Sequence, residues 1–267
     1  MLLEEKILKR FFVDSKKYWE YAVYSAKSGL KSEVASSHLS WLWWILDPLL
    51  FMFVYSFIAI IVFGKGEKYF AAFVFIGLCS WNFFSKTVRQ SVRLVSQNSS
   101  IVSKVYIPKY ILIFTQMMMN GFKMMVSFCL VIGIMLIYRV PVSYRLIYII
   151  PVFLALFIIT FGVSTIMLHF GVFVDDLYNV MNIVLKLLFY LSGIFYNILK
   201  RVDEPYSTIL LKANPIALII NELRNCMIYN TSADMLMIVI WLVAGVVLSI
   251  IGINIIYKYE NSYVKVI

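Results

Sequence analysis

Residues 235–257 read MLMIVIWLVAGVVLSIIGINIIY, a run of apolar and small side chains without a single charge. A transmembrane helix needs about 20 such residues to cross the hydrocarbon core, so this run predicts a membrane span. The whole chain has the same character, because 62% of its residues are hydrophobic and only 14% are charged. Soluble domains have about 45–50% apolar and about 25% charged residues. The sequence therefore predicts an integral membrane protein.

Five further apolar runs precede this one, and together they predict six transmembrane helices in an all-α polytopic fold. The expected spans are Leu42–Phe63, Phe70–Phe84 with an amphipathic continuation through Val95, Ile111–Tyr138, Leu146–Val174, Val180–Ile198 and Met235–Tyr257. We expect a single transmembrane domain (1–267). It would consist of a cytoplasmic interfacial segment (1–40), a six-helix membrane region (41–257) and a cytoplasmic tail (258–267).

Six spans place both termini on one side of the membrane, and the charges of the loops indicate which side. With the N-terminus inside, the cytoplasmic segments hold 14 Lys and Arg residues and the outer segments hold 8. The positive-inside rule therefore places both termini in the cytoplasm. The first 40 residues carry seven of these charges and lack the early apolar core of a signal peptide. The net charge of +10 suits loops that face anionic lipid, so no nucleic-acid partner is expected.

Residues 14–34 have the pattern of an amphipathic helix that lies on the membrane surface. One face is apolar and the other is charged, with Trp19, Ala22, Val23, Ala26 and Leu30 on the first and Lys16, Glu20, Lys27 and Lys31 on the second. Basic residues opposite an aromatic and apolar face suit the membrane interface. The alternative interpretation is a helix packed against a partner domain.

The segment 199–234, between spans five and six, contains two apolar stretches at 209–211 and 216–220. Each is too short to cross a bilayer. Backbone at membrane depth without a full span must be buried in protein or face a water-filled cavity. The sequence therefore predicts re-entrant or interfacial helices here.

Polar side chains recur at helical spacing inside two spans. The fifth span carries Asn182, Lys186, Tyr190, Gly193 and Asn197, and the third carries Gln116, Asn120, Lys123 and Ser127. A lysine at membrane depth is costly, so by default it faces protein or water and indicates function. Two alternatives stay open. Lys186 is near enough to the end of its span to snorkel, and Lys123 could be a structural ion-pair partner, for which Asp47 is one choice.

The first span places Trp44, Pro48, Phe51 and Tyr55 on one face. This face is either a packing surface with an aromatic belt or a surface on which sugar rings stack. In the second case, the expected substrate pathway consists of Trp44, Asp47, Phe51, Tyr55, Lys123, Asn182, Lys186, Tyr190, Tyr196 and Asn197. In the last span, Gly245, Ser249 and Gly252 form a stripe of small residues that predicts a close helix contact.

The sequence contains no recognisable catalytic or metal-binding motif. A phosphate-binding GxxxxGK[ST] pattern is absent, as are GxSxG and HExxH. The histidines His38 and His169 lie far apart, and the three cysteines have no metal-ligand spacing. Asp175 and Asp176 lie where span four is expected to meet the cytoplasm, which favours a solvated or capping role. We therefore expect no catalytic residues, metal or cofactor on this chain.

Four short motifs occur in the order found in one transporter family. Residues 36–43 (SSHLSWLW) with Pro48 are similar to an S-x-L-G-x-x-W…P pattern, although Ser40 stands where glycine is usual. Residues 102–109 (VSKVYIPK) are similar to a cytoplasmic coupling segment, and 191–196 (LSGIFY) to an S-P-I-F-Y stretch with Gly193 in place of proline. Residues 214–216 (NPI), followed by Arg224, are similar to an external N-P…R segment. The chain thus resembles the membrane subunit, a type-2 permease, of ABC exporters for O-antigen, capsule or teichoic acid.

This resemblance implies a half-transporter in the bacterial cytoplasmic (inner) membrane. Two copies of the chain would form a homodimer, and two copies of an ABC ATPase subunit would bind ATP and Mg and drive it. The substrate would be a glycan linked to undecaprenyl pyrophosphate, exported through a bilayer whose lipids surround the chain. The segment that docks on the ATPase would be Val102, Ser103, Lys104, Val105, Tyr106, Ile107 and Pro108.

Two other functions remain as alternatives. A polytopic membrane enzyme that acts on a lipid-linked glycan should have carboxylates or histidines grouped at one membrane face. An ion-coupled secondary transporter usually has internal repeats and more buried carboxylates, whereas Asp47 is the only acidic residue within the expected spans.

Overall fold

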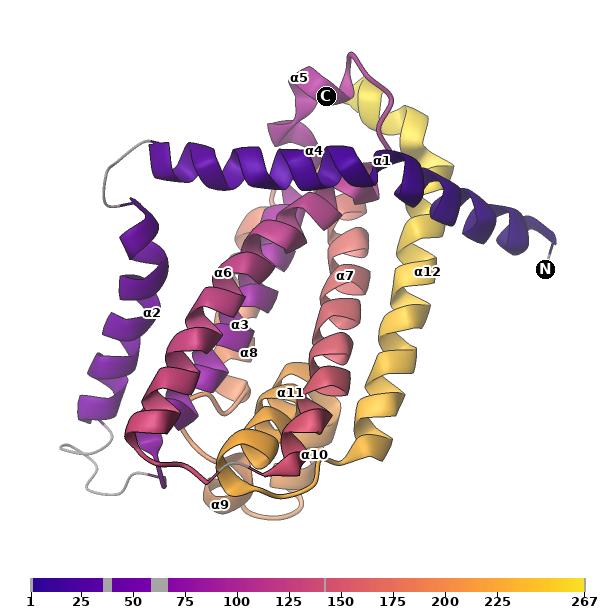
Figure 1. Ribbon diagram of the computed structural model, residues 1–267. Coiled ribbons are helices and arrows are strands. Elements are labelled where there is room, and N and C mark those ends of the chain that lie inside the picture. Colours follow the sequence, from indigo (N-terminus) through magenta and orange to yellow (C-terminus); the bar gives the residue numbers. More distant parts are fainter. Residues whose placement is uncertain (1, 36–39, 59–66, 142, 267) are drawn as a thin grey trace.

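The computed structural model describes residues 2–35, 40–58, 67–141 and 143–266, and all the regular secondary structure in these ranges is helical. Figure 1 shows a bundle of steep helices with a long helix lying across one of its ends. The all-α prediction is confirmed.

Among the residues that the structure describes, four helices are long and apolar enough to cross a membrane. They are α3 (Phe70–Val92), α6 (Lys109–Ile137), α7 (Ile149–Phe173, continuous with the 3-10 turn η2, Tyr144–Tyr148) and α12 (Met235–Val266). They correspond to the expected spans two, three, four and six. The second is longer than its apolar run because its amphipathic continuation is helical to Val92.

The remaining two expected spans are shorter apolar helices, so the count of six full spans is not confirmed. Helix α2 covers Ser40–Phe57, and residues 59–63 of the expected first span lie outside the described residues. Helix α8 covers Leu177–Leu191, so the prediction that the fifth span continues to Ile198 is wrong. The helix stops because Gly193 adopts a left-handed conformation with φ +62°, which only glycine reaches without steric cost.

The long transverse helix is α1 (Leu2–Ala35), which packs mainly on α6. Ala22 and Ala26 are buried against the bundle, and the four charged residues expected on the opposite face (Lys16, Glu20, Lys27 and Lys31) are solvent-exposed. Trp19, expected on the apolar face, is about half exposed (54%). Two short helices, α4 (Leu94–Gln97) and α5 (Ser99–Val102), lie at the same end of the bundle, which we call the α1 face.

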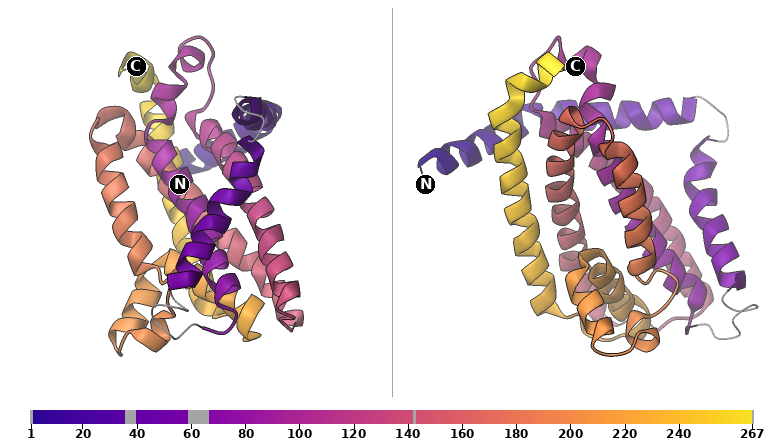
Figure 2. Two further views of the ribbon diagram at one scale, coloured as in Figure 1. Left: turned by 90° about the vertical axis from the view of Figure 1, so that its left-hand side faces the viewer. Right: turned by 180° about the vertical axis from the view of Figure 1, so that it is seen from behind.

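The opposite end, the α11 face, is built from the segment between α8 and α12 (Figures 1 and 2). It consists of α9 (Ile198–Arg201), α10 (Tyr206–Ala213), α11 (Pro215–Arg224) and a π-helical turn, η3 (Asn225–Tyr229). Asn214 caps α11, because its side chain accepts hydrogen bonds from the backbone N–H groups of Ile216 and Ala217 at 3.0 and 3.3 Å. Most of α11 is buried against α3 and α7.

Helices α7 and α12 pack closely along their length, and the predicted small-residue contact is confirmed. A Cβ atom on Gly162 would lie 2.9 Å from the Gly245 carbonyl oxygen, and one on Gly252 would overlap Thr165. Ser249 donates a hydrogen bond within its own helix to Gly245, at 2.7 Å. Larger side chains here would push the two helices apart.

Candidate functional site

Helices α2, α3 and α6 border a cavity of about 340 Å³ in the half of the bundle nearer α1. The structure brings three of the predicted pathway residues together here, namely Trp44, Asp47 and Lys123. The other lining residues are Trp43, Pro48, Cys79, Asn82, Phe83, Lys86, Asn120, Met124 and Ser127. Of these, Asn120 and Ser127 belong to the polar stripe noted on the third expected span, which therefore faces this cavity in part.

Lys123 is held by α1. Its Nζ lies 2.6 Å from Oε2 and 2.7 Å from Oε1 of Glu33, and the indole N–H of Trp44 donates to the same carboxylate at 3.2 Å. The suggestion that Asp47 pairs with Lys123 is therefore wrong, because the last turn of α1 reaches over the cavity and supplies Glu33. Since the Glu33 side chain is 39% exposed, solvent screens this ion pair. Its main effect is to fix Lys123 and Trp44 relative to α1.

A second group of predicted residues meets nearer the α11 face, where α2 approaches the end of α8. The rings of Tyr55 and Phe195 stack with centroids 3.7 Å apart, and Phe51 lies next to Tyr55 at 6.3 Å. Tyr190 lies close enough to Tyr55 to interact with it electrostatically. The Tyr196 hydroxyl donates a hydrogen bond to the Tyr190 carbonyl at 2.9 Å. The expected aromatic face of the first span thus contacts the end of the fifth.

The other predicted pathway residues lie apart from both groups. Asn182 is half-buried and Lys186 is exposed on α8, and neither lines the cavity. Asn197 caps α9 by accepting a hydrogen bond from the Leu199 N–H at 3.1 Å. Within one chain, most residues of the predicted pathway therefore form two separate clusters. The others lie on α8 or cap α9.

The predicted coupling segment lies on the α1 face and divides into exposed and buried residues. Ser103, Lys104, Val105 and Tyr106 are exposed, whereas Val102, Ile107 and Pro108 are buried in the core of this chain. Val102 and Ile107, which were expected in the docking segment, are therefore not at the surface of this chain. Their apolar side chains turn inward and fix both ends of the loop, so 103–106 (the exposed loop) is what remains free to meet a partner.

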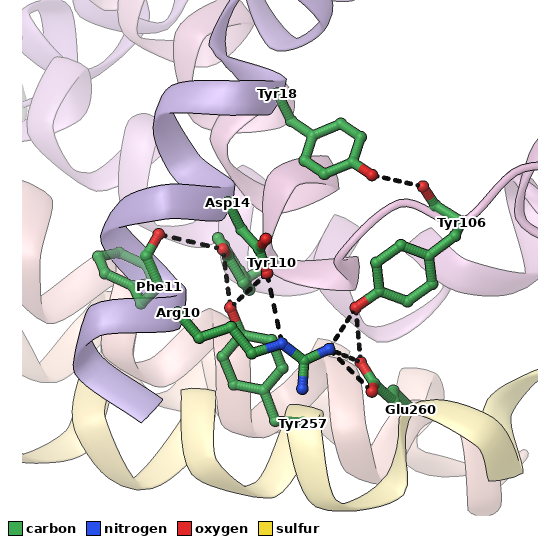
Figure 3. A network of polar contacts seen from close by, with 8 residues as sticks. All are labelled: Arg10, Phe11, Asp14, Tyr18, Tyr106, Tyr110, Tyr257 and Glu260. Carbon is green, nitrogen blue, oxygen red and sulfur yellow. Dashed lines mark hydrogen bonds and ion pairs between the residues drawn. The ribbon is translucent and has the colours of Figure 1, made fainter. Parts of the chain in front are cut away.

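A polar network connects this loop to both ends of the chain (Figure 3). The Arg10 guanidinium of α1 donates to the Tyr106 hydroxyl at 2.6 Å and to both Glu260 oxygens of α12 at 2.9 and 3.0 Å. The Tyr106 hydroxyl donates to Glu260 at 2.8 Å, and the Tyr18 hydroxyl donates to the Tyr106 carbonyl at 3.0 Å. Burial and the nearby Glu260 carboxylate raise the pKa of Tyr106. The phenol therefore stays protonated at neutral pH, as a donor to Glu260 must.

Further contacts extend the network. The Tyr257 hydroxyl donates to Asp14 at 3.0 Å, and the hydroxyls of Tyr257 and Tyr110 lie 3.1 Å apart. Arg10 also sits over the Tyr257 ring, 4.2 Å from its centroid. A shift of the exposed loop would thus change contacts that involve α1, α6 and α12 together.

The predictions missed several of the residues that organise these sites. Glu33, Arg10 and Glu260 were missed because the contacts that organise the sites join them to Lys123, Tyr106 and each other, 90 or more positions away in the sequence. Arg224, noted in the sequence motif, is buried and donates to the carbonyls of Phe73, Gly193 and Ile194 at 3.0, 2.8 and 2.7 Å. Within the described ranges, no group of three or more His, Cys, Asp or Glu residues is placed to hold a metal ion.

Comparison with known proteins extends the resemblance over nearly the whole chain. The chain is 26% identical over 239 residues to an O-antigen export system permease protein RfbA of Klebsiella pneumoniae, covering 89% of this chain and 91% of the relative. A second Klebsiella pneumoniae protein of that name is 27% identical over the same shares. One from Myxococcus xanthus is 25% identical over 70% of this chain and 72% of its own length. No protein-family model matches. The chain is thus similar, over most of its length, to membrane permeases named for O-antigen export.

Proposed function

We propose that this chain is the permease subunit of an ATP-driven exporter that moves a lipid-linked polysaccharide from the cytoplasmic side of the inner membrane outward. The similarity to O-antigen export permeases along nearly the whole chain carries the proposal. The polymer is an O-antigen-like glycan on an undecaprenyl pyrophosphate lipid.

In this proposal the α1 face is cytoplasmic. Both chain ends lie toward this face in Figure 1, and the Lys- and Arg-rich segments 2–35 and 86–110 belong to it. Helix α1 rests at the interface, with its exposed lysines toward the lipid head groups. Helices α2 and α8 cross alongside the four long helices and complete six passes, and α11 re-enters from the outer side.

The conduit is proposed to form between two copies of the chain. Lys186 lies exposed on α8 between Ile183 and Leu187, which are 62% and 60% exposed. A lysine facing lipid at this depth would be costly. A second copy with a water-filled conduit would solvate Lys186 and cover its apolar neighbours. The Phe51–Tyr55–Phe195 cluster would line the same conduit from α2.

Energy would come from a separate ATPase that docks on the exposed loop. The sequence holds no phosphate-binding loop, so ATP and Mg would bind on the partner. The network around Arg10, Tyr106 and Glu260 would pass a movement of the docked partner to the helices.

The first test concerns the partner. The isolated chain is expected to show no ATPase activity and to co-purify with an ATP-binding subunit from native membranes. Hydrolysis should appear only in fractions that contain both proteins. Robust hydrolysis by the isolated chain would contradict the proposal.

The second test concerns the conduit. In a background with Cys79, Cys129 and Cys226 replaced by alanine, single cysteines would be introduced at 51, 55, 186 and 190. All four are expected to react with a water-soluble thiol reagent, and substrate should slow the reaction. Val243→Cys is the matched control, because residue 243 is 54% exposed on the apolar surface of α12 and should stay unlabelled in lipid. If none of the four reacts in any nucleotide state, the conduit lies elsewhere.

A further inference from the structure

The cavity between α2, α3 and α6 combines aromatic surfaces with both hydrogen-bond donors and acceptors. Its α2 wall carries two indoles and the Asp47 carboxylate, and its α3 wall carries the Asn82 amide and the Lys86 ammonium. Asp47 lies on the exposed side of α2, and Lys86 is half-buried. A site with aromatic walls and a few placed polar groups is typical of pockets for small polar ligands.

One buried polar atom on the wall of this cavity lacks a hydrogen-bond partner. Asn120 is 3% exposed, and its Nδ2 donates to Thr87 Oγ1 at 3.0 Å and to Gln90 Oε1 at 2.9 Å. Its Oδ1 has no partner among the described residues. Buried acceptors are nearly always satisfied, and leaving one unpaired is costly. Because Oδ1 is fully covered, a ligand in the cavity would reach it only if the Asn120 side chain reorients.

The balance of charge decides which class of ligand fits. Glu33 neutralises Lys123, and the remaining charges, on Asp47 and Lys86, have opposite signs. A phosphate would be repelled by the Asp47 carboxylate. It would also find no group of hydrogen-bond donors in the cavity without a carboxylate beside it. A sugar ring is neutral, and its hydroxyls both donate and accept. They can donate to Asp47 and accept from Lys86 and Asn82, while the C–H face of the ring covers an indole.

We propose that this cavity is a binding site for a sugar ring of the transported glycan, held on the α1 side of the bundle and separate from the conduit between the two copies. The assignment of the sugar to the exported polymer rests on the proposed function. A volume of about 340 Å³ lies at the small end of ligand pockets and suits one ring rather than a chain segment. Because Glu33 holds both Lys123 and Trp44, the last turn of α1 sets the shape of the site.

The test uses the full chain in phosphatidylcholine nanodiscs and two photoactivatable probes. One is a decyl glucoside and the other is a decyl phosphate, each with a diazirine next to its head group, and the labelled peptides are identified by mass spectrometry. The glucoside is expected to label peptides that contain residues 43–47 and 79–86, and unlabelled octyl glucoside should compete. The phosphate should label them no more than background.

Three variants on α2 sharpen this result. Asp47→Asn should reduce labelling by about tenfold, because it weakens a hydrogen bond to a charged acceptor, and Trp43→Leu should reduce it by about threefold or more. Phe53→Leu is the matched control, since Phe53 is exposed on the same helix and does not line the cavity. It should leave labelling unchanged.

Three results would overturn the sugar site. Stronger labelling by the phosphate would assign the cavity to an anionic head group. Labelling that neither Asp47→Asn nor Trp43→Leu changes would be adventitious, and labelling by neither probe would show that the cavity does not admit a ligand. The outcome is independent of the exporter proposal. Missing labels together with intact ATP-driven export would refute only the site, and labelling without any ATPase partner would refute only the exporter.

Discussion

Replacing Glu260 by arginine is expected to lower ATP-driven export by about tenfold, within the usual range of coupling between distant sites. The substitution places a second guanidinium beside Arg10, which now bonds both Glu260 oxygens. It also removes the acceptor for the Tyr106 hydroxyl. The exposed loop would then lose its hydrogen bond to α12 while keeping the one from Tyr18 of α1. Because the Arg10 side chain is 42% exposed, the folded state should lose little stability. The defect should lie in coupling, measured as glycan exported per ATP hydrolysed.

The reciprocal exchange supplies the control for this prediction. The double variant with Arg10→Glu and Glu260→Arg restores an ion pair across the same gap. It also puts a carboxylate at position 10 beside Asp14, which Arg10 now pairs with at 3.6 Å, so it should recover part of the coupling. Tyr106→Phe removes only the hydroxyl and should have a smaller effect than Glu260→Arg. Normal coupling in Glu260→Arg, with the ATPase still bound, would show that the network does not transmit the movement.

Replacing Arg224 by methionine is expected to prevent stable folding of the α11 face. The guanidinium donates to three carbonyls, one on α3 and two in the turn after α8, and it lies 3.4 Å from the Phe73 ring centroid. Hydrogen bonds from charged donors contribute about 1.5–3 kcal/mol each, and a whole domain is stable by only about 5–15 kcal/mol. Methionine fills a similar volume but offers no donor. The yield of monodisperse protein and its melting temperature in detergent should both fall sharply.

Two further substitutions test whether Arg224 acts through this geometry. A Cβ atom on Gly77 would lie 2.8 Å from Nη2 of Arg224, so Gly77→Ala should displace the guanidinium and destabilise the same region. Arg201→Met is the matched control, because Arg201 is exposed on α9 and should have little effect. An unchanged melting temperature for Arg224→Met would mean that the turn after α8 is held by other contacts.

The parts of the fold that local pattern determines were predictable. Long apolar runs predicted α3, α6, α7 and α12, and amphipathic spacing predicted the exposed charged face of α1. The end of α8 was not predicted, because the run 180–198 stays mostly apolar through Gly193 while the backbone turns there. Hydropathy indicates whether a segment lies in lipid or in water, but it does not indicate where the backbone of that segment turns.

The sites were predicted less completely, because their key contacts join distant parts of the sequence. The cost of a lysine at membrane depth predicted that Lys123 faces protein or water, and Lys123 lines a cavity together with Trp44. Local pattern could not identify Glu33 as the partner of Lys123, since 90 residues separate them. The resemblance included Val102 and Ile107 in the docking segment, whereas the structure buries these apolar side chains and uses them to anchor that loop.

The central claim is that this chain exports a lipid-linked glycan across the inner membrane. The most direct measurement is the transmembrane location of that glycan after depletion of the chain, using surface-accessible labelling of intact cells and of cells opened to the label. We expect full-length lipid-linked glycan to accumulate on the inner side and to disappear from the cell surface. Unchanged surface glycan, or glycan whose chemical structure is altered without inner accumulation, would contradict the account, and the second result would indicate an enzyme.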